Sequence, residues 1–155
     1  MLENWQTTDI IAILAVVSSL SLLGYFSVKT LITSNSFQKG VNLYEAKDYQ
    51  GAEAAFRKVI SINSTNDVVR LLLGDILSQQ GKVEEAKELF AQVIRRSPKN
   101  ADAYLRLANI LMQQNQEVEA KNNLIQAKDL LLKQRQPQRA EQINNLLTKI
   151  SAKSS

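Results

Sequence analysis

The sequence predicts an all-α protein, in which one N-terminal transmembrane helix is followed by a right-handed α-solenoid of three helix pairs and a capping helix. Three observations predict this class. Only 5 of the 155 residues are glycine and 2 are proline, which is too few turn residues for a β-sandwich. An uncharged apolar run lies near the N-terminus, and the rest of the chain repeats with a period of 34 residues.

The apolar run covers residues 10–28 and contains no charged side chain. A helix of that length spans roughly 28 Å, which is close to the hydrocarbon thickness of a bilayer. Trp5 before the run, and Tyr25 and Phe26 near its end, suit the two membrane interfaces. We therefore expect residues 1–32 to form a single-pass membrane anchor.

Two other interpretations of the run are a buried core helix and a cleaved secretory signal. A core helix would normally carry a polar stripe with a helical period, and the serines here make only a weak one. A signal needs a basic segment before the run, whereas residues 1–9 contain no lysine or arginine. Because Lys29, Lys39 and Lys47 follow the run, the positive-inside rule predicts that the rest of the chain lies on the cytoplasmic or stromal side.

The remainder of the chain repeats the same residue types every 34 positions. Five registers share this period: Gly40, Gly74 and Ala108; Leu43, Leu77 and Leu111; Ala52, Ala86 and Ala120; Phe56, Phe90 and Leu124; Val59, Val93 and Ala127. Each unit also reads as two helices joined by a tight turn. Two such helices approach closely only where side chains are small, so we expect Gly74 to face Ala86, with Phe90 beside them.

The repeats are carried by the segments KGVNLYEAKDYQGAEAAFRKVISIN, LLLGDILSQQGKVEEAKELFAQVIRRSP and YLRLANILMQQNQEVEAKNNLIQAK. These segments resemble the tetratricopeptide repeat family. The resemblance implies three units, at about residues 34–66, 67–100 and 101–134, that stack into a right-handed superhelix. One pair cannot bury its apolar face alone, which is why the pairs are expected to stack.

Short segments complete the expected layout. Between the anchor and the repeats, which occupy residues 37–134, we expect a short linker at residues 33–36 or no break at all. Pro137 can open a capping helix over residues 137–150. Its apolar face would consist of Ala140, Ile143, Leu147 and Ile150. Residues 151–155 are expected to be a frayed end.

The resemblance also implies where a partner protein binds. In this family the first helix of each pair lines a concave groove, and the family's groove positions fall on residues of all three units in this chain. These residues are Phe37, Val41, Tyr44, Val68, Leu71, Asp75, Ser78, Gln79, Asp102, Leu105, Arg106, Asn109, Met112 and Gln113. The mixture of apolar, amide and charged groups suits an extended peptide or a helix. The alternative for Leu71 and Leu105 is that they pack between neighbouring helices.

One family sub-type binds the C-terminal carboxylate of chaperones through lysine, arginine and asparagine side chains. The residues at those positions are Phe37, Val41, Leu72, Asp102 and Arg106, of which only Arg106 fits. We therefore expect this carboxylate clamp to be absent.

The positive charge is concentrated near the C-terminus. Residues 121–155 contain seven basic and two acidic side chains, a net charge of +5, within a chain whose total is +4. Such a region can contact anionic lipid or an acidic partner loop, or it can be a solvated face that keeps the protein soluble. We do not expect nucleic-acid binding, because no recognition motif or interleaved aromatic residues accompany the lysines.

The composition argues against catalysis. The chain has no cysteine and no histidine, which excludes thiol chemistry, zinc sites of cysteine or histidine type and a histidine general base. Ser78 and Ser97 therefore have no histidine to activate them. Glu84, Glu85 and Glu88 lie at a helix start, where the helix dipole favours solvated carboxylates. We expect no enzyme activity, cofactor, metal or small-molecule substrate.

The sequence therefore predicts a membrane-anchored scaffold that binds a protein client or a subunit of a membrane complex. The layout resembles tetratricopeptide proteins that assist photosystem I assembly in the thylakoids of cyanobacteria and plastids. The alternatives are a permanent structural subunit of a membrane complex and a receptor that delivers client precursors to the membrane.

Overall fold

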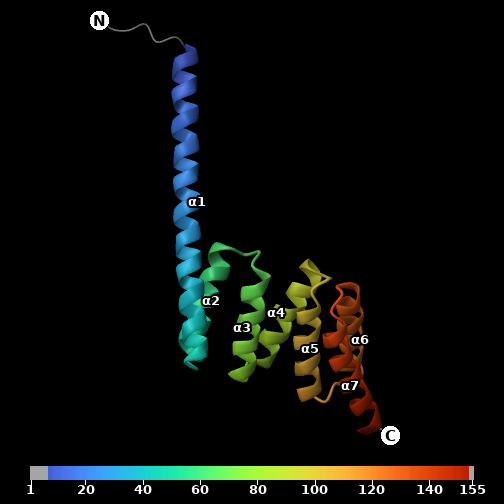
Figure 1. Cartoon of the computed structure of the whole chain (residues 1–155). Coiled ribbons are helices and arrows are strands. Elements are labelled where there is room, and N and C mark those ends of the chain that lie inside the picture. The colour runs from blue at the N-terminus through green and yellow to red at the C-terminus, as the bar shows by residue number, and fades with distance from the viewer. Residues whose placement is uncertain (1–6, 154–155) are drawn as a thin grey trace, which may run out of the picture.

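The computed structural model describes residues 7–153, and they form seven α-helices. The helices are α1 (Thr7–Glu45), α2 (Tyr49–Ile62), α3 (Asp67–Gln79), α4 (Val83–Arg96), α5 (Ala101–Gln113), α6 (Glu117–Lys133) and α7 (Pro137–Lys153). Figure 1 shows a long N-terminal helix that projects from a stack of shorter helices. The all-α class and the paired helices of the stack are confirmed.

The 39-residue helix α1 joins the apolar run to the first repeat without interruption. Residues 33–36 lie inside this helix, so the structure has no linker there and the alternative of no break applies. Residues 10–28 are exposed along their whole length. Within the described residues, α1 is the one helix long and apolar enough to cross a membrane, a property that an N-terminal signal sequence shares.

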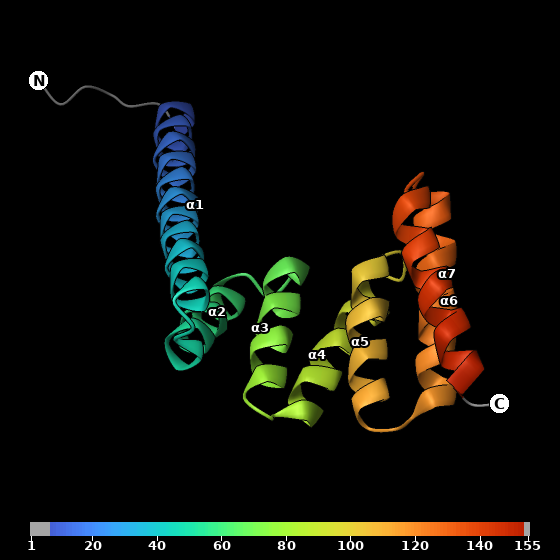
Figure 2. The same ribbon diagram turned by 60° about the horizontal axis from the view of Figure 1, so that its bottom comes forward.

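Consecutive helices run antiparallel, so the loops alternate between the two ends of the stack (Figures 1 and 2). The loops α1–α2, α3–α4 and α5–α6 each contain one residue with positive φ: Lys47 at 61°, Gly81 at 78° and Asn115 at 59°. These three residues are spaced by 34 positions, so the period of the sequence is also a period of the backbone. Helices α3 and α5 begin at Asp67 and Ala101, whereas residue 34, the expected start of the first unit, lies inside α1.

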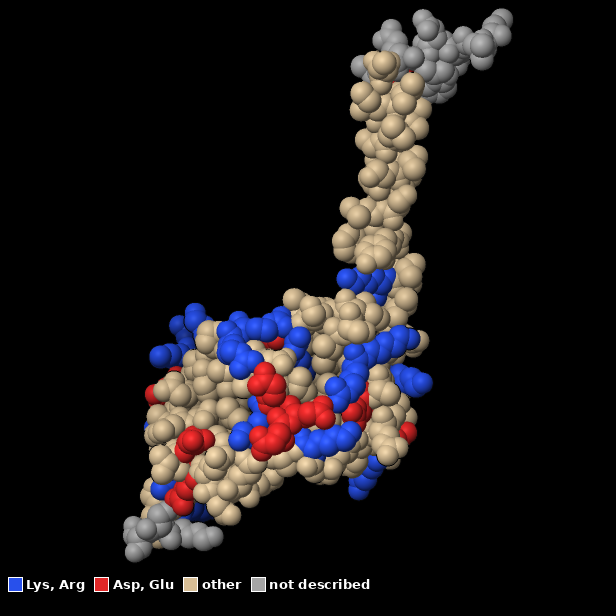
Figure 3. All heavy atoms as spheres, turned by 180° about the vertical axis from the view of Figure 1, so that it is seen from behind, with Lys and Arg blue, Asp and Glu red and all other residues tan. Residues whose placement is uncertain are grey.

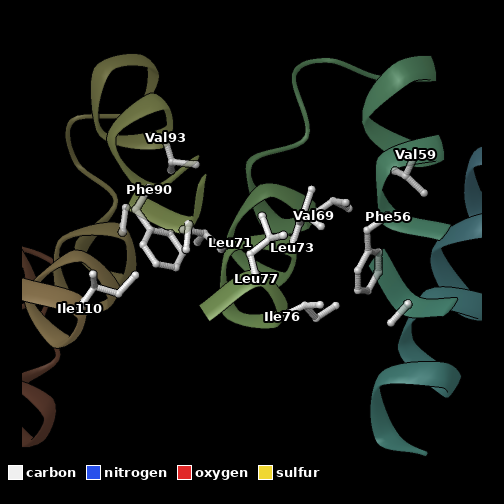
Figure 4. Packing of buried hydrophobic residues seen from close by; sticks show 13 residues of the cluster. Phe56, Val59, Val69, Leu71, Leu73, Ile76, Leu77, Phe90, Val93 and Ile110 are labelled. Carbon is white, nitrogen blue, oxygen red and sulfur yellow. The ribbon is translucent and has the colours of Figure 1, made fainter. Parts of the chain in front are cut away.

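The core is filled by aromatic and branched side chains between the two layers of helices (Figure 4). Phe56 and Phe90 are almost completely buried, at equivalent places in the first two units. A Cβ atom added to Gly40 would lie 2.6 Å from Cε1 of Phe56, and one added to Gly74 would collide with the Phe90 ring. Gly74 therefore faces Phe90 most closely, where we had expected Ala86, and glycine is required because the ring occupies the space of a side chain.

The last helix, α7, packs against α6 and closes the C-terminal end of the stack. Ala140, Ile143 and Ile150 are buried and Leu147 is half-buried, as the pattern of the expected capping helix predicts. The helix extends to Lys153, so residues 151–153 are helical and only residues 154–155 of the expected frayed end lie outside the described residues.

Candidate functional site

The inner helices of the first three pairs enclose a hollow of about 180 Å³. It is lined by Tyr44 of α1, by Asp75, Ser78 and Gln79 of α3, by Phe90 of α4, and by Arg106, Asn109, Ile110 and Gln113 of α5. Seven of these nine residues were expected in the groove from the sequence. Phe90 and Ile110 were not, and both are almost completely buried, so they border the hollow without presenting a surface to it.

An ion pair joins the second and third repeats across this hollow. Nε of Arg106 donates to both carboxylate oxygens of Asp75, each at 2.9 Å, and both side chains are about 30% exposed. Burial raises the pKa of Asp75 above its ordinary value, although the hydrogen bond from Arg106 acts in the opposite direction. The pair fixes the spacing of α3 and α5 and places a polarised carboxylate at the bottom of the groove.

Two amide side chains of α5 line the hollow and have no partner of their own. Asn109 and Gln113 lie one helical turn apart and are both exposed. Among residues 7–153, neither side-chain amide makes a hydrogen bond, and the same holds for Gln79 on α3. Each amide offers donors and an acceptor, which are the groups that pair with the backbone of an extended segment.

A second hollow of about 300 Å³ continues from the first toward the C-terminus. Asn109 contributes to both hollows, and Leu105 lines the second one together with α7 residues that include Arg139, Ile143 and Leu146. Arg139 also donates a hydrogen bond to the carboxylate of Asp102. The expected groove therefore extends onto the capping helix, a contribution that the repeat register alone does not predict because α7 lies outside the repeats.

The remaining expected groove residues are divided between the core and the surface. Leu71 is only 6% exposed and belongs to the core cluster, so the alternative of packing between helices describes it. Phe37 and Val41 pack against that same cluster, and Met112 packs against the C-terminal one. Val68 is 61% exposed in the first turn of α3 and lines neither hollow. Within residues 7–153, no group of acidic side chains could hold a metal ion.

Solved structures share this architecture. The translocator chaperone SycD of Yersinia enterocolitica (alternative dimer) superimposes with a TM-score of 0.73 at 18% identity, over 79% of this chain and 94% of SycD. The TPR2B domain of yeast Sti1, solved as a pHsp70 complex, gives a TM-score of 0.72 at 18% identity, over 79% of this chain and 98% of the Sti1 domain. PcrH in complex with the chaperone-binding region of PopD gives a TM-score of 0.72 at 17% identity, over 79% of this chain and 92% of PcrH. At these identities the likeness concerns the fold.

Comparison of sequences gives a family but no individual relative. The chain has no match among curated protein sequences. A family model described as tetratricopeptide repeat matches residues 43–96 and 79–129, which together make up more than half of the chain. With the 34-residue backbone period and the glycine–phenylalanine contacts of its helix pairs, the chain belongs to the tetratricopeptide repeat family.

Proposed function

We propose that this protein is a membrane-anchored scaffold that holds a segment of a partner protein in its concave groove and thereby assists assembly or stabilisation of a membrane complex. The single observation that carries the proposal is the pair of amides that make no hydrogen bond within residues 7–153 and lie beside accessible apolar side chains. Asn109 and Gln113 offer hydrogen bonds to a bound backbone, while Leu105 and Leu146 in the adjoining hollow offer an apolar contact.

The geometry favours a neutral or basic segment over a C-terminal carboxylate. Arg106 is the one residue that fits the carboxylate clamp of chaperone-binding repeats, and Asp75 already occupies its Nε. A bound carboxylate would also face the Asp75 charge. An internal extended or helical segment avoids both costs, and peptide segments of partner proteins are what related folds hold in SycD with a YopD peptide and in PcrH with PopD.

The membrane anchor in this proposal is the N-terminal part of α1. Its exposed apolar surface over residues 10–28 has no protein partner within the described chain, which favours a bilayer as its surroundings. Lys29, Lys39 and Lys47 favour a cytoplasmic or stromal position for the repeats. The domain layout of this proposal is an anchor at 1–32, repeats to residue 134 and a cap on α7.

We propose photosystem I in a thylakoid membrane as the complex that the protein helps to assemble. The proposal rests on the layout of one span and three repeats, which resembles that of photosystem I assembly proteins. A permanent structural subunit and a receptor for precursors are the two alternative roles. Stoichiometric co-purification with one mature complex favours the subunit, whereas sub-stoichiometric association with incomplete complexes favours the assembly factor.

The groove is tested by replacing Asn109 and Gln113 with alanine in the full chain. Affinity capture from gently solubilised membranes should recover much less partner, because each lost hydrogen bond that leaves a buried group unpaired costs about 1–3 kcal/mol. The matched control is the double alanine variant of Asn122 and Gln126, which are the same residue types at the same spacing on α6 and are also exposed. Equal recovery from both variants would contradict the groove.

The anchor is tested separately by extraction and protease digestion. The full chain should stay in the membrane pellet through alkaline carbonate washing, since an apolar helix of this length is not released by disrupting ionic contacts. Protease added to sealed vesicles with the cytoplasmic side outward should digest the repeats. Release by carbonate would contradict the anchor, and complete protection would reverse the orientation.

A further inference from the structure

The two ends of the repeat stack carry opposite charge. Each end consists of three loops, each with the last four residues of the helix before it and the first four of the helix after it. The end formed by the loops α2–α3, α4–α5 and α6–α7 has seven basic and two acidic side chains, a net charge of +5. The opposite end, with loops α1–α2, α3–α4 and α5–α6, has two basic and six acidic side chains, a net charge of −4.

The basic end is the one from which the apolar part of α1 projects (Figures 1 and 2). Its basic residues are Arg70, Arg95, Arg96, Lys99, Lys133, Arg135 and Arg139. Arg70 is buried, so the other six are the ones that can reach a surface outside the stack. Figure 3 shows Lys and Arg side chains along the edge of the stack next to the base of the projecting helix, with acidic side chains farther from it.

The position of the basic end along the axis of α1 follows from where the α2–α3 loop lies beside that helix. A hollow between α1 and the α2–α3 loop is lined by Lys29, Thr30 and Thr33 from α1 and by Asn63 and Asn66 from the loop side. Thr33 lies five residues beyond Val28, where the uncharged run ends, or about 7.5 Å along the helix axis. That distance is close to the depth of the headgroup layer of a bilayer, so the basic end is level with the headgroups when the run spans the membrane.

Hydrogen bonds tie the three loops into one surface. Arg96 of α4 donates to the carbonyl of Ser64 in the α2–α3 loop. Nε2 of Gln134, in the α6–α7 loop, donates to the carbonyl of Lys99 in the α4–α5 loop at 2.8 Å. The loops that carry the basic groups are therefore connected to one another, so these groups can meet a flat surface together.

Helix electrostatics explain only part of this charge. Arg95, Arg96 and Lys133 lie in the last turns of α4 and α6, where the helix dipole favours cations. Arg139 lies in the first turn of α7, where the dipole disfavours a cation, but the carboxylate of Asp102 accepts its hydrogen bond. Lys99 and Arg135 lie in loops and are exposed. These two residues need another explanation, and an anionic surface supplies one.

Apolar side chains are interspersed with the basic ones at this end. Val68, in the first turn of α3, is 61% exposed, and Leu132, in the last turn of α6, is 52% exposed. Large apolar groups among lysines and arginines are typical of surfaces that rest on a lipid headgroup layer. Val68 and Leu132 lie beside two different loops, so they do not form one apolar patch of the kind that a protein partner would cover.

We propose that the end of the stack formed by the α2–α3, α4–α5 and α6–α7 loops docks on the anionic lipid headgroups of the membrane that α1 spans. The proposal rests on the proposed anchor and adds a second contact to it. Docking fixes the angle between the stack and the bilayer. In this orientation the groove opens in a direction parallel to the membrane surface. The acidic end then points away from the membrane.

The test uses the full chain in vesicles of neutral phosphatidylcholine or of phosphatidylcholine with about one third phosphatidylglycerol. The chain has no cysteine, so a single cysteine in place of exposed Gln138, beside the α6–α7 loop, carries a donor dye. Energy transfer to acceptor-labelled lipid headgroups reports how close this loop lies to the membrane. We expect greater transfer in the anionic vesicles, and loss of the difference at high salt.

The variant set separates docking from a general effect of charge. Replacing Lys99, Lys133 and Arg135 with glutamate should abolish the difference between the vesicles, since each basic group near an anionic surface contributes about fivefold to binding. The matched control replaces Lys121, Lys128 and Lys149 with glutamate. These residues lie on α6 and α7 outside the basic end and far from the α1 residues that set the orientation, so the same change of net charge should leave the transfer unchanged.

The outcomes distinguish the two proposals. Equal transfer in both kinds of vesicle, with the chain still resistant to carbonate, would overturn docking while leaving the anchor intact, and would assign the basic end to an acidic protein. Loss of transfer in both triple variants alike would also overturn docking. Release of the chain by carbonate would instead overturn the anchor, and salt-sensitive flotation with anionic vesicles alone would then still support a basic lipid-binding end.

Discussion

At the scale of single residues, the tightest contact of the second repeat is the one between Gly74 and Phe90. The aromatic ring lies where a side chain at position 74 would begin, and Gly40 and Phe56 repeat this contact in the first unit. Both rings are almost completely buried, so neither can move aside without opening the core. The contact therefore allows the two helices of a pair to approach closely.

We predict that Gly74→Ala destabilises the stack by about 1–3 kcal/mol, because the added methyl group overpacks the contact with Phe90. Urea unfolding of the full chain in detergent, followed by circular dichroism, measures the change. Ser61→Ala is a suitable control, since Ser61 is exposed on α2 and bonds only to the Lys58 carbonyl of its own helix. An unchanged midpoint for Gly74→Ala would contradict the packing described here.

Single residues also show what the sequence can and cannot predict. Gly81 in its turn is predictable, because glycine adopts positive φ without a steric cost. Lys47 at the equivalent position gives no such signal. The ion pair of Asp75 with Arg106 was also unpredicted, although both residues were expected in the groove, because the superhelical register of α3 against α5 decides which side chains meet.

At the scale of elements, a cluster of charged groups couples the first repeat to the second. The carboxylate of Glu53 on α2 accepts from Nζ of Lys82 at 2.8 Å and from Nε of Arg57 at 2.9 Å. Arg57 also reaches Glu85 on α4 at 2.7 Å. The hydrogen bond from Lys82 is the main reason that the pKa of Glu53 is lowered from its ordinary value, and only 14% of its side chain is exposed.

This shift predicts a pH dependence of stability. A carboxyl group with a lowered pKa in the folded state stabilises the fold above its ordinary pKa of 4.5, and the contribution is lost as the pH falls through the lowered value. The free energy of unfolding of the wild type should therefore exceed that of Glu53→Gln at neutral pH, and the difference should shrink in acid. Urea unfolding across the acidic range measures it.

Glu88→Gln is the control for this prediction. The pKa of Glu88 is also lowered, mainly by its hydrogen bond from Arg95, but the carboxylate is exposed and water screens the pair. Its replacement should change the pH profile much less. If the difference in the free energy of unfolding between wild type and Glu53→Gln stays constant with pH, the protonation of Glu53 is not coupled to folding.

The capping helix α7 gives a second prediction at this scale. Ile143 is 5% exposed and packs in the C-terminal core, whereas Leu146, one turn later, is 40% exposed. We expect Ile143→Ala to lower the free energy of unfolding by about 2–5 kcal/mol, and Leu146→Ala to have a much smaller effect. If both variants lose the same amount of unfolding free energy, as measured by urea unfolding, α7 does not close the core as described.

Elements were mostly predictable because their signals are local or periodic. Five registers at a spacing of 34 gave the three helix pairs, and Pro137 with its apolar face gave the start of α7. The expected ends were less accurate. Residues 33–36 contain no glycine or proline, so nothing there stops α1, and α7 continues past Ile150 to Lys153 because no breaker follows it.

At the scale of the whole molecule, one continuous helix links the proposed membrane span to the groove. Tyr44, which lines the hollow with Asp75 and Asn109, belongs to the same helix as the apolar run. With the proposed anchor in a bilayer, a continuous helix would hold the groove at a fixed distance from the membrane. A flexible linker would allow that distance to vary. The charge difference between the two ends of the stack could be computed only after the structure showed which loops share an end.

The most direct test of the central claim is site-specific photocrosslinking of the full chain in its native membrane. A photoreactive amino acid at Gln113, which lines the groove, should crosslink to one discrete partner protein. The same amino acid at Gln126, an exposed glutamine on α6 outside the groove, should not. Crosslinking of the same partner from Gln126 with none from Gln113 would contradict the claim that the concave groove holds the partner.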